Sequence, residues 1–150
     1  MVEAARPATP EDLAAVQSLA DEATAALADQ RGGPHYLALE APAALQVAPD
    51  AALIVGTIDD AVVGFLAARE VGRRDGGRHV GIEALWVTPE AREVGVGECM
   101  LDAVLDWGRA RGCDGVDAIA LPGDRSTKNF FESFGLVARA IVVHRTFDDA

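Results

Sequence analysis

The chain has 150 residues, half of them hydrophobic and a quarter charged, and its formal net charge is −11. This balance predicts one folded domain over residues 1–150 and argues against disorder. With 24 acids against 13 bases, the chain lacks the basic face that nucleic acid requires, whereas an acidic surface favours cationic ligands. We find no membrane-spanning run and no secretion signal, and we therefore expect a cytoplasmic protein that acts away from membranes.

The cysteines and histidines indicate neither a metal site nor a disulfide framework. Cys99 and Cys113 are the two cysteines, and neither belongs to a paired metal-binding spacing. The three histidines are scattered along the chain. We therefore expect free thiols and no metal.

The first predicted helix covers residues 11–28. Thr9 can cap it and Pro10 suits the first helical position. Apolar residues then recur at helical spacing as far as Leu27, and the helix is expected to end before the RGGP segment at 31–34. A second, short helix is expected near residues 40–47.

The next segments predict an antiparallel meander. Two β-type runs, at 52–58 and 61–70, are separated only by Asp59 and Asp60, which is typical of a hairpin. A turn at 72–78 leads to a third predicted strand at 79–87.

The second half alternates between helices and strands. A helix is expected from the region of Met100 to Gly112, a strand at 115–122, a helix at 126–134 and a last strand at 139–147. The crossover after Val87 should make the 115–122 strand parallel to the 79–87 strand. The fold class is therefore α/β, an α+β sandwich with a mixed, mostly antiparallel sheet flanked by helices. The last strand is a candidate for pairing with a second copy in a homodimer.

The stretch WVTPEAREVGVGE at 86–98 carries the clearest chemical signal. A strand runs into a loop with Gly95 and Gly97 and then into a helix, whose first amide groups have no partner within the helix. Such an end binds phosphate, and Arg92 can add a charged contact. The stretch lacks the three-glycine dinucleotide pattern and the GK[ST] of a P-loop. A tight turn that binds no ligand is the alternative.

Several motifs together resemble the GNAT superfamily of N-acetyltransferases. Arg92-x-x-Gly95-x-Gly97, reached from a strand that ends in LWVTP, is similar to that family's motif A. NFFESFGL at 129–136 resembles its second motif, and the opening at 6–13 and the hairpin ending in VVGFL are also similar. The resemblance covers nearly the whole chain. It implies a sheet in which two parallel strands splay apart, with the co-substrate acetyl-CoA in the gap.

The resemblance also implies which residues bind acetyl-CoA. The expected cofactor-binding residues are Leu85, Val87, Arg92, Val94, Gly95, Val96, Gly97, Glu98, Asn129 and Phe131. The amides from Val94 to Glu98 would hold the pyrophosphate, and the backbone of Leu85 and Val87 would hold the pantetheine arm. Glu93 and Asp124 depart from the family pattern, because a carboxylate beside a pyrophosphate is unfavourable and an ionised aspartate cannot donate a hydrogen bond.

Glu83 is the candidate general base, because a carboxylate within the apolar strand GIEALWV requires a reason and burial would favour proton acceptance. In GNAT enzymes an acid on this strand often has that role. The alternative is that Glu83 faces solvent or pairs with an arginine, and His79 is a second candidate. Phe131 stands where the family often has a tyrosine acid, so either the thiolate leaves without direct help or another group serves, such as water, Ser126 or Ser133. Tyr36 is not expected to reach the site.

The sequence therefore predicts an enzyme, an N-acetyltransferase that transfers an acetyl group from acetyl-CoA to a primary amine of a small molecule or protein. The alternatives are a non-catalytic acyl-CoA-binding regulatory or interaction module, and a structural α/β domain without a cofactor. The segments expected to line the acceptor pocket, at 11–28 and 31–37, have no distinctive binding signature, so the sequence leaves the acceptor open.

Overall fold

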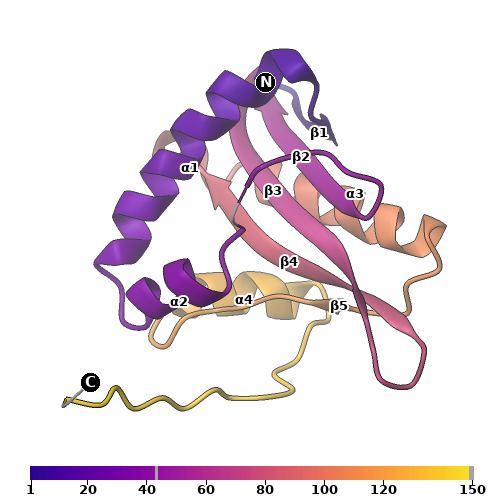
Figure 1. The fold of residues 1–150 in the computed structure, drawn as a ribbon. Helices are drawn as coiled ribbons and strands as arrows, with labels where there is room; N and C mark the ends of the chain where they lie inside the picture. The colour runs from indigo at the N-terminus through magenta and orange to yellow at the C-terminus, as the bar shows by residue number, and fades with distance from the viewer. Residues whose placement is uncertain (43, 149–150) are drawn as a thin grey trace.

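The computed structural model describes residues 1–42 and 44–148. Within them, one sheet has five strands in the order β1-β2-β3-β4-β5 (Figure 1). The elements are β1 (Glu3–Pro7), η1 (Pro10–Asp12), α1 (Leu13–Ala28), α2 (Gly33–Leu39), β2 (Ala51–Ile58), β3 (Ala61–Gly72), β4 (Arg78–Val87), η2 (Pro89–Ala91), α3 (Val96–Ala110), β5 (Val116–Asp117) and α4 (Arg125–Ser133). Only β4 and β5 pair in parallel, so the sheet is mixed and mostly antiparallel, as the sequence predicts.

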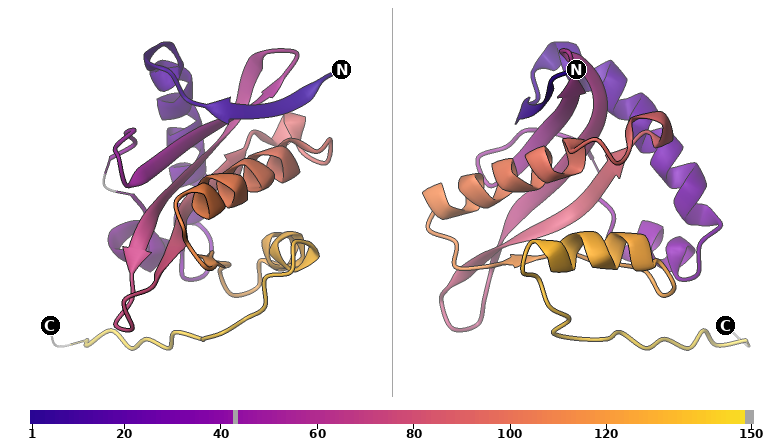
Figure 2. Two further views of the ribbon diagram at one scale, coloured as in Figure 1. Left: turned by 90° about the vertical axis from the view of Figure 1, so that its right-hand side faces the viewer. Right: turned by 180° about the vertical axis from the view of Figure 1, so that it is seen from behind.

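The sheet lies between α1 on one face and α3 with α4 on the other (Figure 2). Strand β2 shows why both faces are covered, because its side chains alternate between two apolar clusters. Leu53 and Val55 pack with α1, whereas Ala52 and Ile54 pack with α3. The continuous apolar run at 51–58 is therefore explained by burial on both faces.

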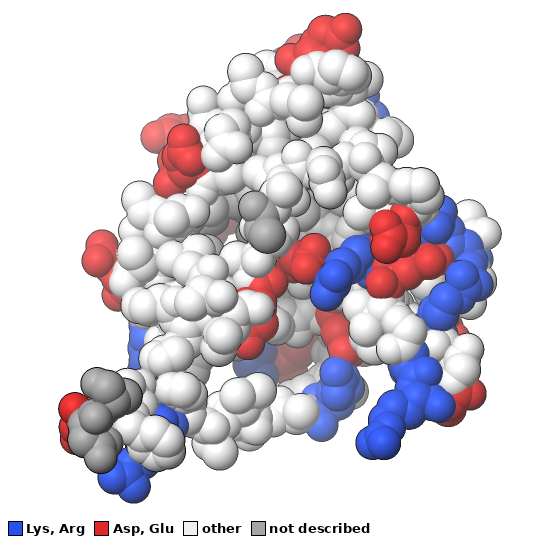
Figure 3. All heavy atoms as spheres, viewed as in Figure 1, with Lys and Arg blue, Asp and Glu red and all other residues white. Residues whose placement is uncertain are grey.

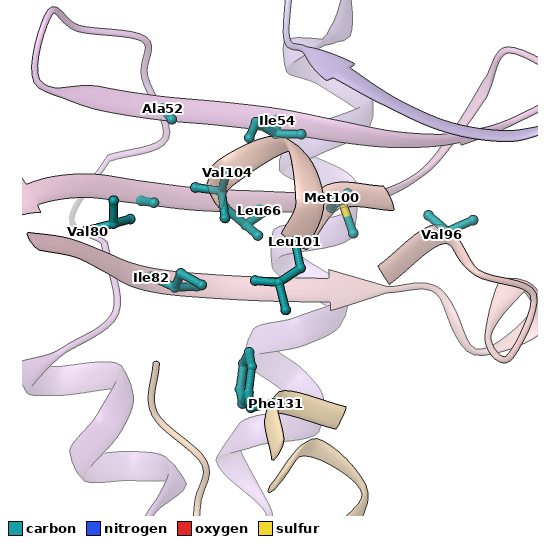
Figure 4. Close-up of a cluster of buried hydrophobic side chains, with 11 residues drawn as sticks. Ala52, Ile54, Leu66, Val80, Ile82, Val96, Met100, Leu101, Val104 and Phe131 are labelled. Carbon is teal, nitrogen blue, oxygen red and sulfur yellow. The ribbon is translucent and has the colours of Figure 1, made fainter. Parts of the chain in front are cut away.

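The cluster on the α3 side is built around Met100, Leu101 and Val104, which are fully buried (Figure 4). Phe131 reaches this cluster from α4 and points toward Leu101, and Ile82 of β4 lies nearby (Figure 4). This contact holds α4 beneath the end of the sheet where β4 and β5 meet.

The predicted hairpin and the first helix start are confirmed. Strands β2 and β3 are joined by Asp59 and Asp60, both at positive φ, which suits the tight turn of a two-residue hairpin. Thr9 and Asp12 form a reciprocal capping box ahead of α1.

The sequence misplaces the second helix, overestimates the fifth strand and misses the first strand. The second helix lies at Gly33–Leu39, not near 40–47, because Pro34 is accepted in its first turn. Strand β1 was not predicted, and β5 has only two residues where a strand at 115–122 was expected.

The expected last strand at 139–147 is absent from the described residues. This segment runs extended away from the sheet, and Ile141, Val142 and Val143 are each 87–88% exposed (Figure 1). The physical reason is that β5 is too short to offer an edge along which a long strand could pair. No helix among the described residues is long and apolar enough to span a membrane.

Candidate active site

A β-bulge in β4 sets the geometry at the centre of the site. Ala68 pairs with Ile82 and Ala67 pairs with Ala84, so Glu83 is one extra residue without a partner in the β3–β4 register. The hydroxyl of Tyr36, on α2, donates a hydrogen bond to the backbone carbonyl of Glu83. The bulge thus leaves the Glu83 carbonyl free of the β3–β4 pairing, and this carbonyl accepts the hydrogen bond that links α2 to β4.

Strands β4 and β5 separate immediately after they meet. They pair only at Val80↔Val116 and Gly81↔Asp117. A pocket of about 100 Å³ lies where the strands part. We call it the donor cleft; its lining residues include Ile82, Leu85 and Trp86 of β4, Ile119 and Leu121 after β5, and Asp124, Thr127 and Phe131 at α4.

The loop after β4 leads into the N-terminus of α3. Gly95 precedes the helix with φ 97°, a conformation that side chains other than glycine rarely adopt. The amides of Val96, Gly97 and Glu98 open the helix and therefore lack partners within it. A Cβ at Gly97 would lie 3.3 Å from the ring of Phe130, so glycine allows α4 to pack against this helix end.

Arg92 and Glu93 occupy the same loop in different ways. The Nε of Arg92 donates to the carbonyl of Val87 at 2.8 Å, and its guanidinium lies 4.5 Å from the ring centroid of Trp86. Arg92 therefore clamps the loop to the end of β4, and its contact with phosphate remains a prediction. Glu93 has φ 66° and is exposed, so the loop has a left-handed residue and a negative charge at one position.

The side chain of Glu83 is 24% exposed, and its Oε2 lies 3.4 Å from the Nε of Arg69. The ion pair with an arginine that was the alternative interpretation is thus present. His79 instead lies 3.3 Å from Asp117 at the start of the splay, away from the bulge.

Helix α4 begins at Asp124, whose carboxylate accepts hydrogen bonds from the amide of Thr127 at 3.2 Å and from its hydroxyl at 2.7 Å. Asp124 is therefore explained as a helix cap. Phe131 is 7% exposed and lines the donor cleft, whereas Asn129 lies on the exposed side of α4.

A second pocket, of about 190 Å³, lies between α1, α2 and the sheet, and we call it the α1–α2 pocket. Five residues line both pockets, namely Ala23, Leu27, Tyr36, Phe65 and Ala84. The two pockets therefore share one wall. On the face drawn in Figure 3, acidic and basic side chains lie side by side around a hollow in the centre of the molecule.

Tyr36 was not expected at the site, and the structure places it in that shared wall. Burial, followed by the carboxylates of Glu83 and Glu40, raises the pKa of Tyr36 to about 12. The signal in the sequence was that it is the only tyrosine, but its distance of 47 positions from Glu83 concealed the contact.

The two parallel strands separate beside the amide end of α3, where backbone donors without partners in the helix could meet an anion. Residues 15–136 match the Acetyltransferase (GNAT) family, and the chain belongs to that family. Proteins of this family use acetyl-CoA. No curated protein sequence matches the chain.

Solved structures agree on the fold. The BH1408 protein of Bacillus halodurans, solved as a tetramutant, is 19% identical with a TM-score of 0.78, covering 98% of this chain and 100% of that one. The ribosomal-protein-alanine N-acetyltransferase of Brucella melitensis biovar Abortus 2308 is 16% identical with a TM-score of 0.74, covering 98% and 100%. AAC(6')-Iy, solved with the bisubstrate analogue CoA-S-monomethyl-acetylneamine, is 21% identical with a TM-score of 0.73, covering 98% and 99%.

Proposed function

We propose that the protein is an acetyl-CoA-dependent N-acetyltransferase that acetylates a primary amine of a small molecule or a protein. The observation that carries the proposal is the early separation of β4 and β5, which opens the donor cleft beside the amide end of α3. Membership of the GNAT family supports the reaction class.

The residues present fit acetyl-CoA at this place. The amides from Val94 to Glu98 would hold the pyrophosphate, since the first amides of α3 lack partners within the helix and can donate to an anion. Leu85 lines the donor cleft and, with Val87, would bind the pantetheine arm. Bound acetyl-CoA supplies the acetyl group as a thioester.

Glu83 would act as the general base. The acceptor amine is protonated near neutral pH, so a proton must pass from nitrogen to the carboxylate, directly or through water, before nitrogen can attack. The nitrogen would then attack the acetyl carbon while the carbon–sulfur bond breaks with its electron pair on sulfur. The second proton that nitrogen loses in becoming an amide would pass to water. The bond from Tyr36 to the carbonyl of Glu83 fixes the backbone of the base, so Tyr36 would be a positioning residue.

Neither Phe131 nor Tyr36 suits the role of a general acid that protonates the departing thiolate. Phe131 has no proton to give, and Tyr36, with its pKa near 12, holds its proton more tightly than a thiol of pKa about 8.5. We therefore expect the thiolate to leave without protonation by either side chain.

The test combines binding and turnover. Calorimetric titration should give micromolar affinity for acetyl-CoA and none for ATP, which has phosphates but no pantetheine arm. Amines should then release free thiol, and Glu83→Gln should lower kcat by about 10²–10⁴-fold while acetyl-CoA affinity is retained. Glu132→Gln, an exposed carboxylate on α4, is the matched control. Turnover by Glu83→Gln equal to that of the parent would remove Glu83 from the mechanism.

A non-catalytic acyl-CoA-binding module is the second candidate. The position of Phe131 favours it, because the side chain that replaces the family's frequent tyrosine is committed to the core. Tight acetyl-CoA binding with no thiol release for any amine would select this candidate.

A further inference from the structure

The α1–α2 pocket carries an inference about the acceptor, which rests on the proposed function. The pocket adjoins the donor cleft through a shared wall that includes Tyr36 and Phe65. A molecule whose nitrogen lies at this wall, beside the thioester, would place its remaining atoms in the α1–α2 pocket. The lining of that pocket therefore indicates what the amine is attached to.

The described lining of the α1–α2 pocket is mostly apolar and has no charged side chain, in a protein of net charge −11. Its residues are Gln17, Ala20, Ala23, Thr24, Leu27, Tyr36, Leu37, Ala41, Pro42, Ala44, Leu45, Phe65 and Ala84. Three of them have polar side chains, and the hydroxyl of Tyr36 already donates to Glu83. A second ammonium group at the inner end of the pocket, among its alanine, leucine and phenylalanine side chains, would lose hydration without gaining a charged partner. The carboxylate of Asp21 lies beside exposed Gln17, at the outer side of the lining.

Negative charge lies instead at the wall where the two pockets meet. Glu83 lies at this wall, where its backbone carbonyl accepts from Tyr36, and its carboxylate pairs with Arg69 at 3.4 Å on one side. Glu40 caps the end of α2, and both carboxylates contribute to the raised pKa of Tyr36. A single ammonium group would be attracted to this place, which is also the place of the proposed base. Charge at one end and apolar surface at the other match an amphipathic monoamine.

We infer that the acceptor is a monoamine that carries an apolar alkyl or aryl group, and that this group fills the α1–α2 pocket. At about 190 Å³ the pocket is smaller than the roughly 300–1,000 Å³ typical for drug-sized ligands, which suits one short chain or one ring. A polyamine or an amino sugar would have to place ammonium or hydroxyl groups against alanine, leucine and phenylalanine side chains.

The test measures thiol release at saturating acetyl-CoA with hexylamine, ethylamine, 1,5-diaminopentane and neamine. Each methylene that enters the pocket should raise kcat/KM by about fourfold. Hexylamine has four more methylenes than ethylamine, so its kcat/KM should be higher by about 16-fold if two of them enter and by about 250-fold if all four do. The kcat/KM for hexylamine should also exceed that for 1,5-diaminopentane by about tenfold or more, because the diamine has the same length but carries a second ammonium group.

Two variants localise the effect to the pocket. Ala20→Leu shortens the α1–α2 pocket outside the shared wall and should bring the hexylamine-to-ethylamine ratio toward one, whereas Ala25→Leu, on the exposed side of α1, should leave the ratio unchanged. Gln17→Glu is on the exposed surface, so its folding is not in question. It adds a carboxylate at the pocket and should raise the kcat/KM for 1,5-diaminopentane relative to that for hexylamine.

The outcomes separate this inference from the proposed function. A preference for neamine or 1,5-diaminopentane, or ratios that Ala20→Leu and Gln17→Glu leave unchanged, overturns the inference while acetyl transfer to amines stands. Acetyl-CoA binding without thiol release from hexylamine also overturns it. Absence of both acetyl-CoA binding and thiol release overturns the proposed function together with the inference.

Discussion

The only tyrosine of the chain offers a direct test of the wall between the two pockets. Burial is the largest cause that raises the pKa of Tyr36 from 10.0 to about 12, and the carboxylates of Glu83 and Glu40 add to it. Two units correspond to roughly 3 kcal/mol of preference for the neutral hydroxyl in the folded protein. Because folding raises this pKa, the contribution is complete below about pH 10 and is lost as the pH rises to about 12.

Phenolate absorbance in an alkaline titration reports Tyr36 alone. We expect a midpoint near 12 for the folded protein and near 10 in urea, with circular dichroism recording the fold over the same range. Tyr36→Phe gives no phenolate signal, and its stability should not share the loss between pH 10 and 12. A midpoint near 10 with the fold intact would refute the burial of Tyr36 and its bond to Glu83.

Three further substitutions test the loop, the packing and the first helix. Glu93→Gly removes an exposed charge and a left-handed side chain, and calorimetry should show acetyl-CoA affinity raised by about two- to fivefold, less at high salt. Gly56→Ala places a Cβ 2.4 Å from a methyl group of α3 and should cost about 1–3 kcal/mol in urea unfolding, whereas Gly72→Ala, with nothing within 4 Å, should cost less than about 0.5. The hydrogen-bonded Arg6 guanidinium lowers the pKa of Asp12, so the stability deficit of Asp12→Asn relative to the parent should be full at pH 7, begin to shrink below about pH 4 and shrink further as the pH falls toward the lowered pKa. Urea unfolding at about pH 7 and about pH 2.5 measures the difference.

The sequence predicted the elements whose signals are local. Asp59 and Asp60 between two apolar runs marked the hairpin, and Gly95 before a helical pattern marked the start of α3. Thr9 and Pro10 marked the first helix in the same way. In each case a few adjacent residues determine the backbone conformation, so the pattern carries the information.

The remaining features depend on contacts between distant parts of the chain. The bulge at Glu83 is visible only in the pairing of β3 with β4, and Tyr36 reaches it from another layer of the fold. The sequence misplaces α2 because glycine and proline, here Gly33 and Pro34, are also typical of turns. The tight corner before α2 is visible only in the structure, where a Cβ added to Gly33 would collide with the carbonyl of Leu27. The α1–α2 pocket is lined largely by alanine and leucine, which have no local signature of binding.

Glu83 takes part in the site through two groups, its backbone carbonyl and its side-chain carboxylate. Its backbone carbonyl holds Tyr36 and thereby α2, while its carboxylate pairs with Arg69. Glu83→Gln keeps the first connection and should lower kcat with little change in the KM for the amine. Tyr36→Phe removes the first connection, at about 0.5–1.5 kcal/mol of stability, and should raise the KM for the amine through a displaced α2.

The double variant, Glu83→Gln with Tyr36→Phe, tests whether Tyr36 affects kcat only through Glu83 or independently of it. If Tyr36 acts only by holding the backbone that bears the base, Tyr36→Phe should lower kcat in the parent but not in Glu83→Gln, where the carboxylate is gone. It should raise the KM for the amine in both backgrounds. Equal and independent losses of kcat in both backgrounds would mean that the Tyr36 hydroxyl acts on the reacting groups themselves. Steady-state kinetics on the parent, the two single variants and the double variant distinguish the two cases.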